Sequence, residues 1–209
     1  MLRALGAMTL AVVTLATACP GMAAPAAVTC PRLAVAPTLD GTVGDAEWSG
    51  AAALAPFVLA RGKGMPSLTT EAFIGYTDEG IFVCARLFDP APMQIHCYAT
   101  ARDGAVGADD SFHLLLDSTG AGASFLHMAV NAAGATYDAM DDDASVDFNW
   151  SAVTGLRGDG WTVEMVARFE GASPQVGDRW LMTCLRNAPR AGERSAWTAG
   201  EALPAASEL

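Results

Sequence analysis

Pro37-Thr38-Leu39-Asp40-Gly41, followed closely by Glu47-Trp48, is the stretch that says most about the fold of this chain. The proline restricts φ at the start of the stretch, and Asp-Gly forms a tight turn in which the glycine can adopt a positive φ. Leu39 supplies one apolar anchor beside that turn. The stretch therefore predicts a sharp entry turn, after which a carboxylate and an indole arrive together at the first strand region.

Three more blocks follow this stretch in order. Residues 69–90 have the pattern of a β-hairpin, Asp109-Asp110-Ser111-Phe112 opens a strand, and Gly160-Trp161-Thr162-Val163-Glu164 opens another. The ordered set of four resembles the family 9 carbohydrate-binding modules, which share a β-sandwich with the DOMON group of sugar- and haem-binding domains. The resemblance covers roughly residues 37–197.

The apolar pattern by itself also indicates an all-β chain. Runs of strand length are separated by Gly, Asp and Pro, and no stretch beyond the N-terminal segment keeps a 3.6-residue apolar period. Residues 81–88 are apolar on nearly both faces, which is typical of a strand in the middle of a sandwich. We predict an antiparallel β-sandwich, immunoglobulin-like or jelly-roll-like, of about 9–11 strands. The expected strands are 54–60, 70–76, 80–88, 111–117, 124–131, 135–139, 149–154, 161–169 and 179–187.

The charge balance excludes one class of partner. The chain of 209 residues has 12 Lys and Arg against 23 Asp and Glu, a net charge of −11, and its basic residues form no cluster. A surface that tracks nucleic-acid phosphates needs the opposite balance, so we expect no nucleic-acid partner. Charged residues make up only 17% of the chain, which favours a buried core over long disorder.

The N-terminus has the composition of a secretory signal. Arg3 supplies the positive end, residues 10–18 form a short apolar run, and Ala23-Ala24 permits cleavage. This run is too short to span a membrane, and no later segment approaches the required length. We expect a secreted or periplasmic bacterial protein, with a lipid anchor at Cys19 as the alternative. The expected parts of the chain are a signal peptide at 1–24, a lead-in linker at 25–36, the sandwich at 37–199 and a C-terminal tail at 200–209.

Four cysteines remain after Cys19, an even number in an oxidising compartment. Cys30 and Cys97 lie in loop-like sequence and are the better candidates for a disulfide. Cys84 and Cys184 lie in the middle of apolar strands, where buried free thiols and a disulfide are equally compatible with the sequence.

Several polar residues interrupt otherwise apolar strands, and two interpretations stay open for them. In the structural interpretation they pair across strands, as Glu164 would with Arg186, because a buried charge needs a partner. In the functional interpretation they line a concave sheet face and hydrogen-bond sugar hydroxyls. The residues concerned are Arg86, His113, His127, Asn131, Glu164, Arg168 and Arg186.

The resemblance also implies where a sugar would stack. In family 9 modules a sugar lies between two aromatic rings, and the matching positions here are Tyr76, before the hairpin turn, and Trp197, near the end of the domain. The family pattern continues beyond that tryptophan, whereas this chain stops twelve residues later. The candidate ligand-binding residues are Tyr76, Arg86, His113, Asn131, Arg186 and Trp197, whereas Trp48, Trp150, Trp161 and Trp180 are expected in the core or at its rim.

An acidic run offers a candidate metal site. Asp141, Asp143 and Asp147 supply oxygen ligands at spacings that a calcium loop can use, and the resemblance implies structural calcium. The run is not an EF-hand, because Val146 replaces the turn glycine and Ala152 occupies the twelfth position, where a bidentate glutamate is needed. A solvated acidic loop is the alternative.

Catalytic motifs find no support in the sequence. There is no Gly-x-Ser-x-Gly elbow, and the acidic residues cluster in loops. We therefore expect an exported, non-catalytic carbohydrate-binding domain that serves polysaccharide breakdown, with an oligosaccharide or polysaccharide as its partner. One alternative is a structural or interaction sandwich whose sugar site has decayed. The other is a DOMON-like haem domain that uses His113 or His127 with Met128 or Met182 as axial ligands.

Overall fold

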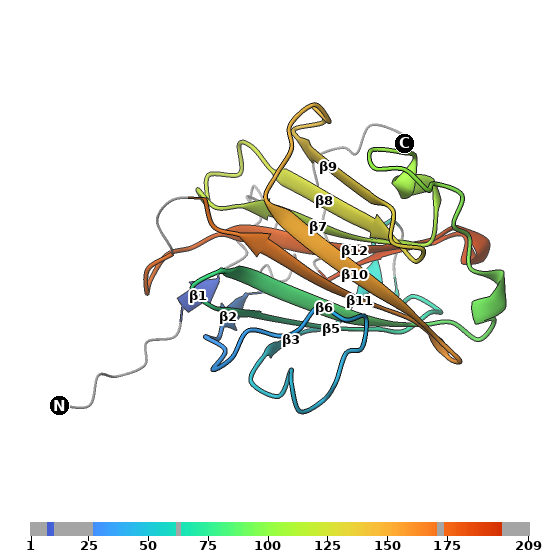
Figure 1. The fold of residues 1–209 in the computed structure, drawn as a ribbon, viewed down its shortest axis with the longest axis horizontal. Coiled ribbons are helices and arrows are strands. Elements are labelled where there is room, and N and C mark those ends of the chain that lie inside the picture. The colour runs from blue at the N-terminus through green and yellow to red at the C-terminus, as the bar shows by residue number, and fades with distance from the viewer. Residues whose placement is uncertain (1–7, 11–26, 62–63, 171–173, 198–209) are drawn as a thin grey trace.

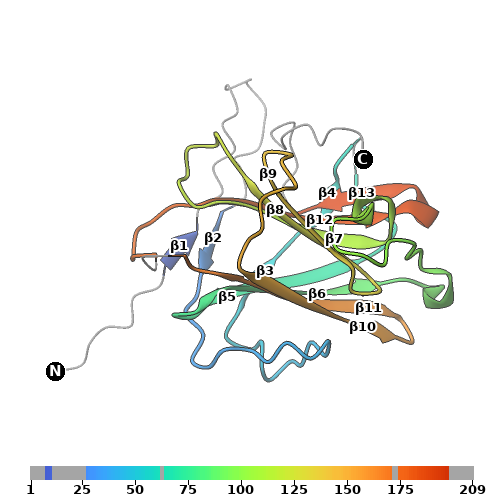
Figure 2. The ribbon, with the colours of Figure 1, turned by 45° about the horizontal axis from the view of Figure 1, so that its top comes forward.

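Two antiparallel sheets face each other and form a β-sandwich (Figures 1 and 2). A computed structural model of the chain describes residues 8–10, 27–61, 64–170 and 174–197. The five-stranded sheet has the order β10 (Trp150–Arg157), β11 (Gly160–Arg168), β6 (Gly80–Phe88), β5 (Thr70–Tyr76) and β3 (Ala52–Leu54). The six-stranded sheet has the order β4 (Val58–Leu59), β13 (Glu193–Ala196), β12 (Leu181–Ala188), β7 (Ser111–Asp117), β8 (Leu126–Asn131) and β9 (Thr136–Met140). The predicted fold class is confirmed.

The remaining elements are short. Strand β1 (Met8–Leu10) pairs with β2 (Val28–Cys30) as a separate two-stranded sheet. Three 3-10 helices lie in connections: η1 (Pro92–Gln94), η2 (Val106–Ala108) and η3 (Pro189–Ala191). In the part of the chain that the structure describes, no helix has the length and hydrophobicity needed to cross a membrane.

Strand β6 shows why the sequence folds into layers. Its odd-numbered residues, including Ile81 and Val83, point into the cluster between the two sheets. Its even-numbered residues Phe82 and Cys84 point outward, into a second cluster with Trp48. Side chains alternate between the faces of a strand, so a strand that is apolar on both faces needs a layer on each side.

The second layer comes from the segment before the first strand of the sandwich. Leu33, Val43 and Trp48 pack on the outer face of the five-stranded sheet, against Phe82 and Val166. The five-stranded sheet is therefore covered on both faces over this region. Trp48, Trp161 and Trp180 are buried and Trp150 is partly buried, as expected for core and rim residues.

Most expected strands are present, and three of them have the bounds expected from the sequence: β5, β6 and β7. The single strand expected at 54–60 is wrong. Here the chain forms β3, which belongs to the five-stranded sheet, and β4, which belongs to the six-stranded sheet. The cis Ala55-Pro56 bond lies between them, and a proline has no N–H to donate to a ladder. Strands β1, β2 and β13 were not expected.

Cys30 and Cys97, the better candidates for a disulfide, are not bonded to each other or to another cysteine among the described residues. Cys30, Cys84, Cys97 and Cys184 are all free thiols. Cys184 faces the interior between the sheets, whereas Cys84 faces the outer cluster, so these two thiols lie on opposite sides of the five-stranded sheet. Burial raises the pKa of Cys30 to about 12, which keeps this thiol protonated and unreactive. Cys19 lies outside the described residues.

Candidate functional site

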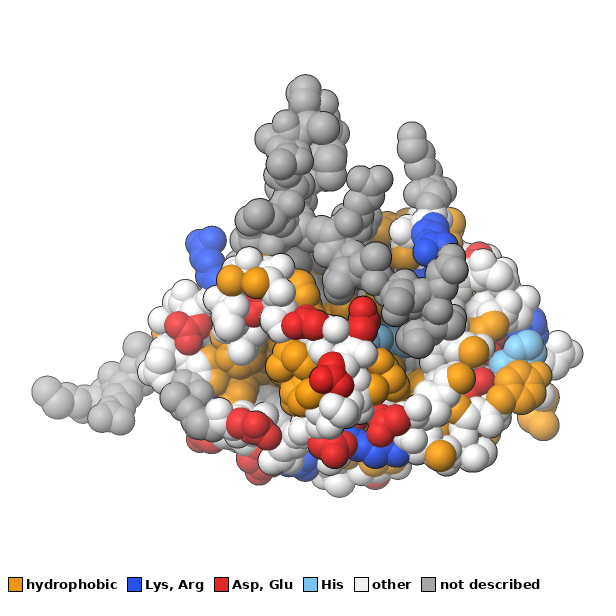
Figure 3. All heavy atoms as spheres, turned by 90° about the horizontal axis from the view of Figure 1, so that it is seen from above, with side chains coloured by type: hydrophobic (Ala, Val, Ile, Leu, Met, Phe, Trp, Pro, Cys, Tyr) orange, Lys and Arg blue, Asp and Glu red, His pale blue; other side chains and the backbone are white. Residues whose placement is uncertain are grey.

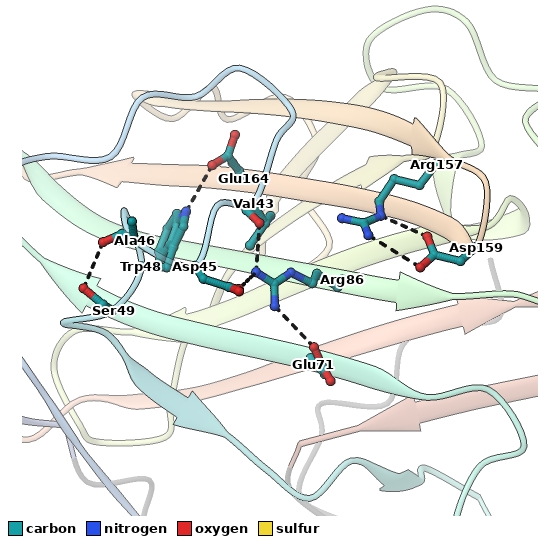
Figure 4. A network of polar contacts seen from close by, with 10 residues as sticks. All are labelled: Val43, Asp45, Ala46, Trp48, Ser49, Glu71, Arg86, Arg157, Asp159 and Glu164. Carbon is teal, nitrogen blue, oxygen red and sulfur yellow. Dashed lines mark hydrogen bonds and ion pairs between the residues drawn. The ribbon is translucent and has the colours of Figure 1, made fainter.

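The opening motif of the sequence binds a buried carboxylate on β11. Glu164 Oε2 accepts hydrogen bonds from the backbone N–H groups of Asp40, at 3.0 Å, and Gly41, at 2.9 Å. Its Oε1 accepts from Trp48 Nε1 at 3.1 Å (Figure 4). Burial raises the pKa of Glu164, and these three donors act against that rise. The first and last sequence blocks therefore meet at Glu164, and their role there is structural.

Gly41 has to be a glycine for two reasons. Its φ is 82°, a conformation that side chains with a Cβ rarely adopt. A Cβ at this position would also lie 2.9 Å from the backbone oxygen of Thr154 on β10. The Asp-Gly turn thus lets the covering segment approach the sheet closely enough to reach Glu164.

The predicted pairing of Glu164 with Arg186 is wrong. Arg186 lies on β12, on the face that it shares with Met182 and Cys184, so its side chain points between the sheets. Its Nη1 donates to the backbone oxygen of Thr69 at 2.9 Å and its Nη2 to that of Phe88 at 2.8 Å. Burial lowers the pKa of this arginine to about 10, against the opposing charge of Asp110 and Asp89. Arg186 therefore links the six-stranded sheet to the ends of β5 and β6.

We expect Arg186→Lys to lower the free energy of unfolding by about 2 kcal/mol, because an ammonium group cannot reproduce a planar fork that bonds two separate carbonyl oxygens. Urea denaturation measures the change. Arg61→Lys, at an exposed position, is the control and should change stability by less than about 0.5 kcal/mol. Equal stability of the two variants would show that Arg186 does not hold the sheets together.

Arg86 also has a structural environment. It lies on the outer face of the five-stranded sheet, where its Nη2 donates to the backbone oxygen of Val43 at 2.8 Å and pairs with Asp45 (Figure 4). Its Nη1 lies 3.5 Å from Glu71. The guanidinium therefore fastens the covering segment to the sheet.

His113 belongs to a polar chain on the outer face of the six-stranded sheet. The Ser111 hydroxyl lies 3.1 Å from the backbone oxygen of Asp109 and 2.9 Å from His113 Nε2, and His113 Nδ1 lies 2.8 Å from His127 Nε2. Because the serine has one proton to donate and the carbonyl can only accept, the consistent arrangement has each histidine protonated at Nε2. Both imidazoles are then neutral. Burial lowers the pKa of His113 well below its usual range and that of His127 to about 4.

This placement does not favour the haem alternative. His113 and His127 point to the outer face, whereas Met128 and Met182 lie in the interior cluster between the sheets. A sheet separates the imidazoles from the thioethers, so neither histidine can share an axis with either methionine.

Asn131 anchors a connection. Its side-chain amide donates to the backbone oxygen of Ala99 and to Asp109 Oδ2, both at 2.8 Å. Its side-chain oxygen accepts from the backbone N–H groups of Ala133 and Ala135. All its polar atoms are engaged within the protein, and the residue is buried.

The two aromatic rings implied by the resemblance are both buried. Tyr76 is 6% exposed and Trp197 is 3% exposed, and both belong to the interior cluster. The Arg32 guanidinium lies over the Tyr76 ring, 5.8 Å from its centroid. Neither ring offers a free face for stacking in this structure. The six candidate ligand-binding residues therefore do not share a surface.

A hollow of about 390 Å³ lies between the β5–β6 turn and the segment that leads into the sandwich. Arg32 and Asp78 form an ion pair across it. None of its polar side chains belongs to a predicted site residue. Thr77, Asp78 and Glu79 nevertheless follow the predicted site residue Tyr76 directly in the sequence. The lining residues are Arg32, Leu33, Ala34, Ala36, Thr77, Asp78 and Glu79.

The acidic run does not form a calcium site. Asp141 accepts from Ser124 and the backbone of Phe125, Asp143 accepts from Ser145, and Asp147 pairs with Arg102. Calcium needs six to eight oxygen ligands around one point, whereas these carboxylates point to separate protein partners. Among the described residues, no group of three or more Asp, Glu, His or Cys side chains is placed to hold a metal ion. The residues present do not fit a bound calcium.

Comparison with solved structures supports the architecture. A family 9 carbohydrate-binding module from Caldicellulosiruptor kristjanssonii, in complex with cellotriose, superposes with a TM-score of 0.58 at 19% identity, over 78% of this chain and 85% of the module. Its complex with glucose gives 0.57 at 18% identity, over 79% and 87%. A protein from Bacteroides uniformis gives 0.55 at 11% identity, over 74% and 80%. No protein-family profile and no curated protein matches the sequence. These likenesses show the fold.

Proposed function

We propose that this protein is a non-catalytic carbohydrate-binding domain with a neutral oligosaccharide as its ligand. The observation that carries the proposal is the similarity of the whole sandwich to a module solved with cellotriose and with glucose. On the face of the molecule shown in Figure 3, acidic side chains lie scattered among neutral ones and basic side chains form no continuous patch. That distribution favours a neutral ligand over an anionic one.

The hollow at the β5–β6 turn is the proposed binding site. It combines an arginine with the hydroxyl of Thr77 and the carboxylates of Asp78 and Glu79. Such groups can donate to and accept from sugar hydroxyls, and its volume falls within the usual range for small-ligand pockets. The proposed location is the periplasm or the cell surface, with a role in the breakdown of polysaccharides.

We expect Arg32→Ala combined with Glu79→Ala to weaken the binding of cello-oligosaccharides about tenfold, because hydrogen bonds to charged groups are lost. Isothermal titration calorimetry measures the affinity. Arg61→Ala, an exposed arginine that follows β4 in the other sheet, is the matched control and should bind like the wild type. Equal binding by the two variants would show that the hollow is not the site. A wild type that binds no neutral glycan would contradict the proposed function.

One observation favours a second candidate function, that of a structural or interaction domain. Tyr76 and Trp197 occupy the positions that the resemblance assigns to sugar stacking, yet both rings are packed in the core. A sandwich that retains its fold after losing its sugar site would look the same. The wild-type glycan titration separates this candidate from the first.

A further inference from the structure

The connection between β6 and β7 presents an aromatic ring to solvent. Tyr98 is 78% exposed, and among the described residues it is the one exposed large aromatic side chain. Met93, on the same connection, is 96% exposed. A single exposed ring is ordinary on a protein surface, so the way in which the backbone holds this ring is what matters.

Two buried carboxylates hold the backbone around Tyr98. The N–H of Tyr98 donates to Asp109 Oδ1 and that of Ala99 to Asp109 Oδ2, both at 2.9 Å. The N–H of His96 donates to Asp110 Oδ2 at 2.8 Å, and its carbonyl accepts from the N–H of Asp110 at 2.9 Å. Asp109 and Asp110 are almost fully buried at the start of β7. The segment is therefore fixed to the sandwich although it belongs to no strand.

A third buried residue completes this anchor. Asn131, at the end of β8, donates from one amide group to the backbone oxygen of Ala99 and to Asp109 Oδ2. The Asp109-Asp110 pair therefore anchors the backbone of residues 96–99 to the sandwich. Because the backbone is already ordered, binding at Tyr98 does not carry the entropic cost of ordering the loop.

The surroundings of the ring suit a sugar. The His96 ring lies 5.6 Å from the Tyr98 ring, with the two planes inclined at 46°. A pyranose has an apolar C–H face, which stacks on an aromatic ring, and a rim of hydroxyls, which a neighbouring imidazole can hydrogen-bond. A phenol beside an inclined imidazole offers both kinds of contact.

We propose that Tyr98, with His96 at its edge, is a second carbohydrate contact that stacks one neutral pyranose ring. The class of ligand rests on the proposed function. The contact is separate from the hollow, because the β5–β6 turn precedes β6 and the Tyr98 connection follows it. Strand β6, of nine residues, is about 30 Å long, and the two segments leave from its opposite ends.

A protein partner is the less suitable occupant. A stable protein interface buries about 800 Å² on each side and is built around several anchoring side chains. The described part of this connection exposes two large apolar residues, Met93 and Tyr98. The apolar surface of two side chains matches one sugar ring better than a protein interface.

The test uses the full chain in the Arg32→Ala/Glu79→Ala background, which removes two of the three charged side chains of the hollow and leaves Asp78. Binding of a soluble cellulose derivative is measured by affinity electrophoresis before and after adding Tyr98→Ala. Tyr98→Phe keeps the ring and Met93→Ala is the matched control on the same connection. Wild-type protein is also nitrated with tetranitromethane, with and without cellohexaose, and Tyr98 modification is followed by peptide mass spectrometry.

We expect Tyr98→Ala to weaken the remaining binding about tenfold, with Tyr98→Phe and Met93→Ala within about twofold of their parent. Cellohexaose should slow the nitration of Tyr98. All these substitutions lie on the surface, so melting temperatures should not change. Unchanged binding by Tyr98→Ala, together with unprotected nitration, would overturn the second contact and leave the proposed function standing. A wild type that binds no glycan would overturn both.

Discussion

Replacing Glu164 by alanine is expected to lower the free energy of unfolding by about 3 kcal/mol, because two buried donors and one partly buried donor lose their acceptor. The donors are the backbone N–H groups of Asp40 and Gly41 and the indole N–H of Trp48. The covering segment should then detach from the five-stranded sheet. Urea denaturation measures the loss, and the fluorescence of Trp48 reports the detachment.

Glu164→Gln refines this test. The carboxylate accepts two hydrogen bonds at one oxygen and one at the other, so an amide must direct its NH₂ group at a donor in either orientation. We expect it to cost about 1–2 kcal/mol, between the wild type and the alanine variant. Glu71→Ala, at a half-exposed carboxylate on the same outer face, is the control and should cost less than about 0.5 kcal/mol. A Glu164→Ala variant as stable as this control would contradict the structural role of the motif.

Acidification from pH 7 to pH 4 is expected to remove about 3 kcal/mol of stability through His127. The unfolded chain titrates its histidines near pH 6.5, whereas the folded state lowers the pKa of His127 to about 4. Between these values the unfolded state binds more protons, so the free energy of unfolding falls as the pH falls. Burial also lowers the pKa of His113, which adds to the same trend.

The charges around the histidines act in both directions. Arg194 disfavours protonation of His127 and Asp142 favours it, while burial is the largest cause of the shift. Glu164 and Asp110 have raised pKa values, so they favour the folded state on acidification and offset part of the loss.

Urea denaturation at pH 7, 6, 5 and 4 measures this dependence. His127→Gln should flatten it, because the glutamine amide can still donate to His113 without taking up a proton. Gln94→Ala, at an exposed position without a titratable side chain, is the control and should keep the wild-type slope. An unchanged slope in His127→Gln would show that other groups govern the acid response.

Much of the fold follows from local pattern. Strands β5, β6 and β7 have the bounds that alternation and turn residues predict, because side-chain direction along a strand depends only on adjacent residues. The region around Ala55-Pro56 was the exception. Its composition is that of one strand, but the chain crosses there from one sheet to the other, and residue pattern does not encode which sheet a strand joins.

The site was less predictable than the fold. Arg86, His113, Asn131 and Arg186 were correctly recognised as polar residues on apolar strands, but each has a different set of partners and a different face. Exposure also cannot be derived from residue type. Tyr76 and Trp197 are buried while Tyr98 is exposed, because burial depends on which segments lie over a ring.

The sequence by itself determined that this chain is an antiparallel sandwich and that Pro37–Gly41, Glu47-Trp48 and Glu164 belong to its framework. Only the tertiary structure decided that they meet, with the N–H of Gly41 bonded to a carboxylate 123 residues later. The physical reason is that alternation along a strand specifies which face a side chain takes, whereas its partner is set by the segment that packs on that face. Such a partner can come from anywhere in the chain.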